Sequence, residues 1–239
     1  MRRREGCARL ARTTRTMVFF DVGDTLLERA RDEATCIMGV LDDLGMPPEA
    51  ALRRRGLEAM AHAYRVGLYA AATRGGEDRL WRSLALACLR GWDGGGEDAV
   101  AALARVLAGY AAWYRPVAGM LGLLADLRAA AVDLGVVSNW PPSLADLLER
   151  HGFGGFPVLA CSGVLRCTKP DLQIFRWALE RAGVSAATCW HIGDDPECDY
   201  RPATALGLRA VLWDPRGRHR GAGMRRAGDV SQLRGILGL

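Results

Sequence analysis

The stretch "MVFFDVGDTLLE", residues 17–28, decides the expected fold. Its first four residues are apolar, and they run directly into Asp21. A run this short and this apolar predicts a strand buried on both faces, as in a parallel sheet. Carboxylates are seldom buried without a partner or a function. The stretch therefore raises the question why the strand ends on Asp21 and why Asp24 follows three residues later.

Short apolar runs recur along the chain and alternate with helical patterns. The further runs that predict strands cover residues 132–138, 157–161, 188–193 and 209–213. The helical patterns between and after them cover residues 117–130, 142–151, 171–183, 199–206 and 229–237. Strands that alternate with helices form a parallel sheet with right-handed crossovers. We predict an α/β fold with a Rossmann-like parallel sheet of about five or six strands.

One connection breaks this rhythm. About 110 residues separate the first two predicted strands, a length that is implausible for a loop. Helical patterns cover residues 29–45, 49–70, 78–91 and 97–113 of this segment. We therefore predict a helical cap domain over residues 28–113, inserted into a core domain formed by residues 17–27 and 114–239. Residues 1–16 are expected to be a disordered basic extension, and Met17 could be the true start.

Composition excludes several classes of protein. The seven cysteines are scattered without a C-x-x-C pair, which favours the reduced thiols of a cytoplasmic protein. No apolar run reaches the roughly 18–20 residues that span a membrane. The net charge of +5 is concentrated near the two ends, without the aromatic residues or motifs of nucleic-acid recognition. We expect no nucleic-acid or membrane partner, and a monomer or homodimer.

Polar residues gather where the predicted strands end. The chain has a single lysine, Lys169, and a single asparagine, Asn139, and both fall at this edge of the predicted sheet. The full set there comprises Asp21, Ser138, Asn139, Lys169, Asp194, Asp195 and Asp199. Ligands of open parallel sheets bind at the carboxyl ends of the strands. The sequence therefore predicts a functional site at this edge.

These residue types suit phosphoryl chemistry. Clustered carboxylates offer the oxygen ligands that Mg²⁺ prefers. A fixed lysine charge and a serine hydroxyl can stabilise a phosphoryl group, whose transfer depends on positioning and charge. An aspartate can also act as the nucleophile and carry the phosphoryl group.

Four short motifs carry a resemblance to a known family. They are "DVGDTL" from residue 21, "SN" from residue 138, "KPD" from residue 169 and "GDDPECD" from residue 193. In this order, and each at a strand end or in the following loop, they resemble the four motifs of the haloacid dehalogenase-like (HAD) hydrolase superfamily. The resemblance covers residues 17–214, and the helical insert resembles the α-helical cap of that superfamily's first cap class. It implies a Mg²⁺-dependent hydrolase, and most often a phosphatase acting on a small phosphorylated metabolite.

The resemblance also implies a role for each motif residue. Asp21 would be the nucleophile, and Lys169 would orient it and bind the phosphate. Thr25 would steady the first loop, while Ser138 and the Asn139 amide would hold the phosphate. The implied Mg²⁺ ligands are Asp21, the backbone carbonyl of Gly23, Asp194 and Asp199. We expect Asp195 to be an exposed neighbour of Asp194, and the alternative is that it also binds the metal.

The first motif departs from the family pattern. Family phosphatases carry a second aspartate two residues after the nucleophile, as general acid and base. Gly23 stands at that position here, and Asp24 lies one residue further on. We expect Asp24 to cap its own turn through backbone N–H groups, and the alternative is that it enters the site as a catalytic group.

Gly23 leaves other functions open. The chain could be a catalytically weak or inactive protein that binds phosphometabolites or interacts with partners. A haloacid dehalogenase is a further alternative, but the first motif lacks the aromatic residue typical of those enzymes. Schiff-base chemistry is excluded because residues 28–113 contain no lysine.

Overall fold

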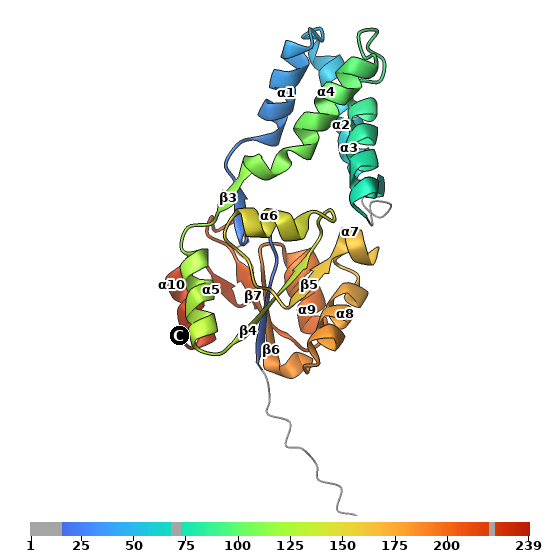
Figure 1. Cartoon of the computed structure of the whole chain (residues 1–239). Coiled ribbons are helices and arrows are strands. Elements are labelled where there is room, and N and C mark those ends of the chain that lie inside the picture. Colours follow the sequence, from blue (N-terminus) through green and yellow to red (C-terminus); the bar gives the residue numbers. More distant parts are fainter. Residues whose placement is uncertain (1–15, 68–72, 220–222) are drawn as a thin grey trace, which may run out of the picture.

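The fold is built around a central sheet of six strands, seen in the computed structural model in Figure 1. The structure describes residues 16–67, 73–219 and 223–239, so nearly all of the predicted basic extension lies outside the described residues. The strands run in the order β5, β4, β1, β6, β7, β8, and every neighbouring pair is parallel. Their bounds are β1 Met17–Phe20, β4 Asp133–Ser138, β5 Val158–Cys161, β6 Cys189–Gly193, β7 Arg209–Trp213 and β8 Arg226–Ala227. The predicted α/β fold and parallel sheet are confirmed.

The sequence of β1 explains its central place. All four of its residues are buried, because alternate side chains face opposite layers of the core. Val18 and Phe20 pack in one apolar cluster, whereas Met17 and Phe19 pack in the other. β1 therefore needs cover on both faces and takes a place between β4 and β6.

Helices supply that cover. α5 Met120–Ala129 and α10 Val230–Leu237 lie on one side of the sheet, and α8 Leu172–Ala182 and α9 Arg201–Ala205 lie on the other (Figure 1). The short helices α6 Leu144–Arg150 and α7 Ser162–Leu165 follow β4 and β5. Each of the five helices predicted after residue 114 is present, with ends shifted by a few residues.

Four further helices stand above the carboxyl edge of the sheet (Figure 1). Their bounds are α1 Glu33–Asp43, α2 Ala50–Gly67, α3 Arg74–Cys88 and α4 Glu97–Ala108. Side chains that precede two of them act as N-caps: Asp32 accepts a hydrogen bond from Thr35 N, and Thr73 accepts one from Gly76 N. The 3-10 turn η2 Tyr110–Trp113 leads back to the sheet. The division into a cap over residues 28–113 and a core stays a prediction.

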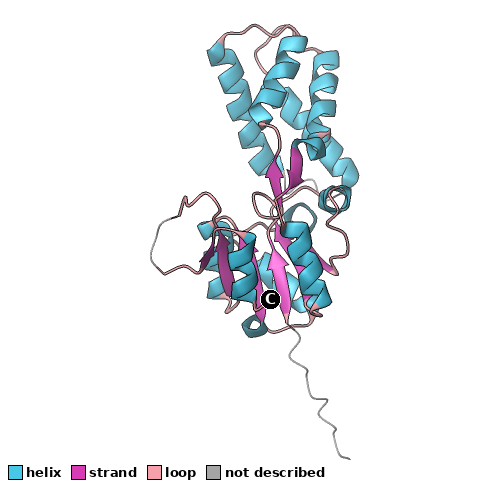
Figure 2. Ribbon diagram, turned by 90° about the vertical axis from the view of Figure 1, so that its left-hand side faces the viewer, coloured by secondary structure: helices cyan, strands magenta, loops and turns pink. Residues whose placement is uncertain are grey.

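A small ribbon joins these helices to the sheet, as Figure 2 shows. β2 Leu27–Arg29 pairs antiparallel with β3 Tyr114–Pro116, with Arg29 opposite Tyr114. The expected helix from residue 29 is therefore wrong at its start, because Arg29 belongs to a strand and α1 begins at Glu33. The pairing places the segment that leaves the sheet for the four helices beside the segment that returns from them.

Two other features bear on the expectations drawn from composition. Within the described residues, no helix is both long enough and apolar enough to span a membrane. The cysteines of the described residues are all free.

Candidate active site

Asp21 lies at the centre of the sheet edge. Its backbone N–H donates to the Ile192 carbonyl at 2.8 Å, which continues the pairing of β1 with β6. Its side chain lines a cleft of about 260 Å³, together with residues that follow β4 and β6. The four regions that the sequence placed at this edge do meet: the residues lining the cleft include Asp21, Gly23, Asp24, Ser138, Asn139, Lys169, Asp194, Asp195 and Asp199.

Lys169 is the cation of the cluster. Its Nζ lies 2.6 Å from Asp21 Oδ1 and 2.6 Å from Asp199 Oδ1, and its side chain is only 3% exposed. Burial by itself would lower the pKa of Lys169, but the two carboxylates together hold that pKa above its usual value. Lys169 therefore stays charged and fixes the positions of both aspartates.

The nucleophile candidate receives two hydrogen bonds on one oxygen. Ser138 Oγ donates to Asp21 Oδ1 at 2.9 Å, and Lys169 Nζ donates to the same atom. Burial raises the pKa of Asp21, against the opposing charge of Lys169. Both side-chain donors thus contact Oδ1, and a backbone hydrogen bond from Val22 further opposes the rise in the pKa of Asp21.

Three carboxylates are close enough to share one ion. Oxygens of Asp21, Asp194 and Asp199 all lie within 4.8 Å of one another. Burial, and then the charges of Asp21 and Asp199, raise the pKa of Asp194 to about 7. Lys169 offsets only part of this negative charge. The all-oxygen donor set fits a hard divalent cation such as Mg²⁺.

Asp199 is held from three sides. Lys169 and His191 Nε2 both contact its Oδ1, the latter at 2.9 Å, and Asp195 N donates to its Oδ2 at 3.2 Å. Although burial opposes it, these partners keep the pKa of Asp199 below its usual value. A Cβ on Gly193 would come within 2.2 Å of Asp199 Cγ, so only glycine leaves room for this carboxylate.

Asp195 has a different task from its neighbours. Its Oδ1 accepts hydrogen bonds from Glu197 N at 2.7 Å and from Cys198 N at 3.0 Å. It thereby caps the short π-helical turn η4 Pro196–Tyr200, which carries Asp199. Asp195 does not belong to the three-carboxylate group, and its alternative role as a metal ligand stays a prediction.

Asn139 joins two of the loops. Its side-chain amide donates to the Lys169 carbonyl at 3.0 Å, and its Oδ1 accepts from Lys169 N at 2.8 Å. This two-way bridge fixes the backbone that carries the lysine. Because the side chain is committed to Lys169, the backbone N–H is the group of Asn139 that a phosphate could use.

The first loop differs from the expectation for Asp24. The N–H groups of Leu26 and Leu27 donate to the Val22 carbonyl, at 3.0 and 2.8 Å, rather than to the Asp24 side chain. Within the part of the chain that the structure describes, the Asp24 carboxylate has no hydrogen-bond partner, although it lines the cleft. Asp24 has a φ of 50°, a left-handed conformation that aspartate tolerates better than most residues. The expected turn cap is therefore wrong. Thr25 is fully buried, and no described residue forms a hydrogen bond with its hydroxyl.

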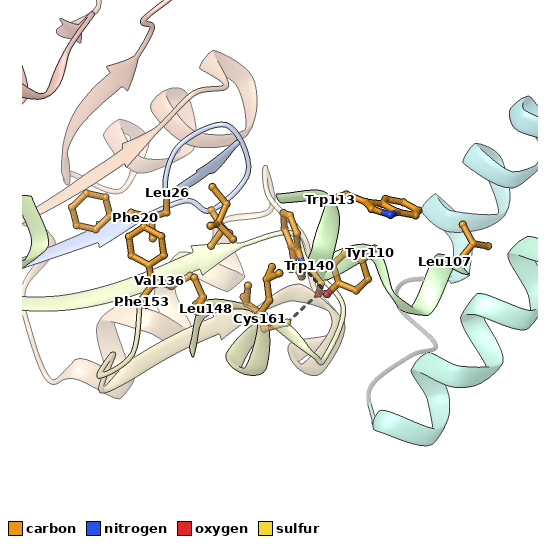
Figure 3. Packing of buried hydrophobic residues seen from close by; sticks show 14 of the residues in the cluster. Phe20, Leu26, Leu107, Tyr110, Trp113, Val136, Trp140, Leu148, Phe153 and Cys161 are labelled. Carbon is orange, nitrogen blue, oxygen red and sulfur yellow. Dashed lines mark hydrogen bonds between the residues drawn. The ribbon is translucent and has the colours of Figure 1, made fainter. Parts of the chain in front are cut away.

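Sequence reasoning missed Trp140, which closes the space beside Gly23. A Cβ on Gly23 would lie 3.4 Å from Trp140 Cζ3, so the indole ring borders the place of the missing side chain. Trp140 Nε1 donates to the Tyr110 hydroxyl at 3.0 Å, and the two rings lie side by side in Figure 3. No signal in the sequence pairs Gly23 with a tryptophan more than a hundred residues later.

A second missed residue joins α3 to the start of α6. The buried Glu77 accepts hydrogen bonds from Ser143 N, at 2.8 Å, and from the Ser143 hydroxyl. The Ser143 hydroxyl also lies 2.7 Å from the Tyr110 hydroxyl. A chain of buried polar contacts thus runs from Glu77 through Ser143 and Tyr110 to Trp140, which borders the cleft.

This site and this fold define a class, that of hydrolases with an aspartate-centred site at the edge of a parallel sheet. The model of the haloacid dehalogenase-like hydrolase family matches residues 16–207. The chain therefore belongs to the haloacid dehalogenase-like hydrolases, and the resemblance drawn from the four motifs is confirmed.

The chain is also similar to several named proteins. The chain is 39% identical over 90 residues to haloacid dehalogenase-like hydrolase domain-containing protein 3 of Mus musculus, covering 37% of this chain and 36% of that protein. It is 28% identical over 205 residues to a phosphoglycolate phosphatase of Pseudomonas putida, covering 82% of this chain and 68% of that protein. The chain spans only about two fifths of the length of the first relatives, at 36% and 41%.

Solved structures share the fold. The HAD-hydrolase YfnB from Bacillus subtilis, bound to magnesium, superposes with a TM-score of 0.69 at 22% identity, covering 95% of this chain and 99% of that one. A 2-haloacid dehalogenase from Pseudomonas syringae superposes with a TM-score of 0.68 at 23% identity, covering 94% and 98%. At these identities the likeness concerns the fold alone.

Proposed function

We propose that this hydrolase is a Mg²⁺-dependent phosphatase that acts on a small phosphorylated molecule through Asp21. The observation that carries the proposal is the cluster of three carboxylates within 4.8 Å of one another, with Lys169 Nζ 2.6 Å from two of them. Relatives named as phosphatases support it, among them a phosphoserine phosphatase of Thermus thermophilus, 35% identical over 96 residues. The free cysteines support the further expectation of a cytoplasmic enzyme.

The cluster would hold the metal through Asp21, Asp194, Asp199 and the Gly23 carbonyl. Bound there, Mg²⁺ would supply positive charge that lowers the repulsion between the substrate phosphate and the carboxylates. Lys169 and Ser138 would contact the transferred phosphoryl oxygens, together with the Asn139 backbone N–H. These groups stabilise the charge that spreads over the equatorial oxygens during transfer.

The reaction would proceed in two halves. In the first, a carboxylate oxygen of Asp21 forms a bond to phosphorus while the bond from phosphorus to the leaving oxygen breaks, giving an aspartyl-phosphate. In the second, a water attacks the same phosphorus and breaks its bond to Asp21, which releases inorganic phosphate. The leaving oxygen needs a proton in the first half, and the water must lose one in the second.

Asp24 is our candidate for this proton carrier. Its carboxylate lines the cleft without a hydrogen-bond partner among the described residues, and its charge acts on Asp194. Asp24 stands one position later in the chain than the acid/base aspartate of the family motif. Its left-handed backbone changes the direction of the side chain, which lines the cleft. Asp24→Asn should therefore lower kcat by about 10²–10⁴-fold.

The decisive experiment is release of phosphate from an aryl phosphate by the purified protein, with and without Mg²⁺. We expect turnover only with Mg²⁺, and no turnover from Asp21→Asn. Full activity of Asp21→Asn, or of protein freed of metal by a chelator, would contradict the mechanism. Asp126→Asn is the matched control, because the Asp126 side chain is 51% exposed and does not line the cleft.

A second candidate function is binding of a phosphometabolite without turnover, which the glycine at position 23 favours. Gly23→Asp distinguishes the two. The backbone there is not left-handed, and a Cβ would meet Trp140 at an ordinary 3.4 Å, so the substitution is sterically possible. A large gain in phosphatase rate would indicate that the native protein lacks an acid. A good native rate without gain would indicate that another group, Asp24 on our proposal, does the work.

A further inference from the structure

A larger cavity adjoins the catalytic cleft. It has a volume of about 390 Å³ and lies between the sheet edge and the helices above it. Asn139 and Trp140 line both spaces, so the cavity begins where the phosphate site ends. A molecule whose phosphate reached Asp21 would extend into this cavity.

Aromatic side chains dominate the walls. The cavity is lined by Tyr64, Trp81, Tyr110, Trp113, Tyr114 and Trp140, with apolar residues between them. Several of the rings pack on one another: the centroids of Trp81 and Tyr110 are 5.2 Å apart, and those of Tyr114 and Trp140 are 5.3 Å apart. These contacts fix the rings in place, so that the walls are preformed.

The polar atoms of two of these rings are already engaged. Trp140 Nε1 donates to the Tyr110 hydroxyl, and that hydroxyl contacts Ser143 Oγ at 2.7 Å. The labelled rings in Figure 3 show Trp140 and Tyr110 turned toward each other at this contact, with Trp113 nearby. Because Trp140 Nε1 and the Tyr110 hydroxyl already form hydrogen bonds within the protein, they offer little to a polar ligand. The walls therefore suit apolar and aromatic groups.

The charged residues at the rim of the cavity also favour an uncharged ligand group. Among the described residues that line the cavity, Arg29 and Glu33 are the charged ones, and Arg29 Nη2 lies 3.2 Å from Glu33 Oε2. Arg29 also interacts with the Tyr114 hydroxyl. The cation that the described residues place at the rim is therefore partnered, and these residues offer no unpaired positive charge to a carboxylate on the substrate.

We infer, on the basis of the proposed phosphatase function, that the substrates are phosphate monoesters of uncharged aromatic alcohols, with the aromatic group held in this cavity. The volume lies within the range of about 300–1,000 Å³ that is typical of cavities for small organic ligands. Esters whose alcohol carries a carboxylate, such as phosphoserine, fit it poorly because desolvating that charge is not repaid. The cavity therefore selects for the ring, while the cleft reacts with the phosphate.

The test compares two esters with the same reacting group. We expect kcat/KM for 2-(1-naphthyl)ethyl phosphate, which like O-phosphoserine is the ester of a primary alcohol, to exceed that for O-phosphoserine by about 10–100-fold, since burial of a ring favours only the first ester. Ala61 lines the cavity from α2, and its small side chain leaves room there. Ala61→Phe fills that room and should lower the ratio of the two kcat/KM values at least tenfold.

A matched variant controls for effects on the helix. Ala51→Phe introduces the same side chain into α2 at a position that is exposed, as Ala61 is, but does not line the cavity, and it should keep the native ratio. Faster turnover of phosphoserine than of the aromatic ester by the native protein would overturn the inference. So would an unchanged ratio of the two kcat/KM values in Ala61→Phe. Either result would leave the phosphatase proposal intact.

Failure of the two proposals can be told apart. If the protein with Mg²⁺ releases no phosphate from either ester, the phosphatase proposal fails. Calorimetric titration of the same protein then still decides the inference, because unreacted 2-(1-naphthyl)ethyl phosphate should bind at least tenfold more tightly than phosphoserine. Equal affinities for the two esters, or a preference that survives in Ala61→Phe, would refute the aromatic pocket.

Discussion

Replacing Lys169 by methionine should destabilise the metal-free protein by about 3–5 kcal/mol at pH 7, the usual cost of removing one partner from a buried ion pair. Methionine is similar in length to lysine without its charge, so it fills most of the same space. The native Nζ lies 2.6 Å from both Asp21 Oδ1 and Asp199 Oδ1. The variant thus leaves two buried carboxylates beside each other without their lysine.

Protonation limits this cost. A buried carboxylate can take up a proton rather than remain charged, and for an aspartate with a usual pKa of 3.8 this costs about 4 kcal/mol at pH 7. One proton between Asp21 and Asp199 removes most of their repulsion. Each pH unit below 7 lowers the cost by about 1.4 kcal/mol. At pH 5 the deficit of the variant should therefore be roughly 1–2 kcal/mol.

The sign follows from the direction of each pKa shift. In the native protein, Lys169 and His191 hold the pKa of Asp199 below 3.8, so Asp199 stabilises the fold above that pH and loses this effect as the pH falls through its folded pKa. In the variant, burial without a cation raises the folded pKa above 3.8. The carboxyl then destabilises the fold at neutral pH, and the effect fades as the pH falls.

Urea unfolding in the presence of a chelator, at pH 5, 6 and 7, measures these differences. Arg218→Met is the matched control, since Arg218 Nη2 lies 3.3 Å from Asp194 Oδ2 but its side chain is 43% exposed. Loss of such an exposed pair should cost less than about 1 kcal/mol. A deficit below about 1 kcal/mol for the lysine variant at pH 7, or one that does not change with pH, would refute this account of the cluster.

Three further predictions concern the site and its supports. Gly193→Ala should abolish Mg²⁺-dependent turnover and lower the melting temperature, because its Cβ would come within 2.2 Å of Asp199 Cγ; calorimetry and phosphate release check both. Glu77→Ala should cost about 2–4 kcal/mol in denaturant unfolding, since two buried donors of Ser143 lose a charged acceptor. Affinity for Mg²⁺, measured by titration calorimetry, should rise between pH 5.5 and 7 and level off above, because the pKa of Asp194 is about 7 and the ion requires the deprotonated carboxylate. An affinity independent of pH would contradict the last of these.

Local sequence was enough to predict the sheet and the place of the site. β1 is short, wholly apolar and buried, and its length and its phenylalanines favour a strand over a segment of a buried helix. The site residues could be grouped because parallel strands present their carboxyl ends at one edge, whatever the side-chain detail. Lys169 and Asn139 stood out because each is the only residue of its type in the chain.

Only the tertiary structure decided what each of these side chains does. The φ of 50° at Asp24 and the use of the Val22 carbonyl by the turn cannot be read from "DVGDT", since several turns suit those residues. The ribbon of β2 and β3 was missed because each strand has three residues and exists through pairing between distant segments.

Asp21 and Asp24 separate what the sequence determined from what only the tertiary structure decided. The sequence by itself determined that Asp21 ends a buried strand at the carboxyl edge of the sheet, because that follows from hydrophobic pattern and strand order. The direction of Asp24, the ring of Trp140 beside Gly23 and the aromatic cavity beyond them depend on contacts between residues far apart in the chain. Such contacts are set by packing of the whole molecule, for which a local pattern holds no information.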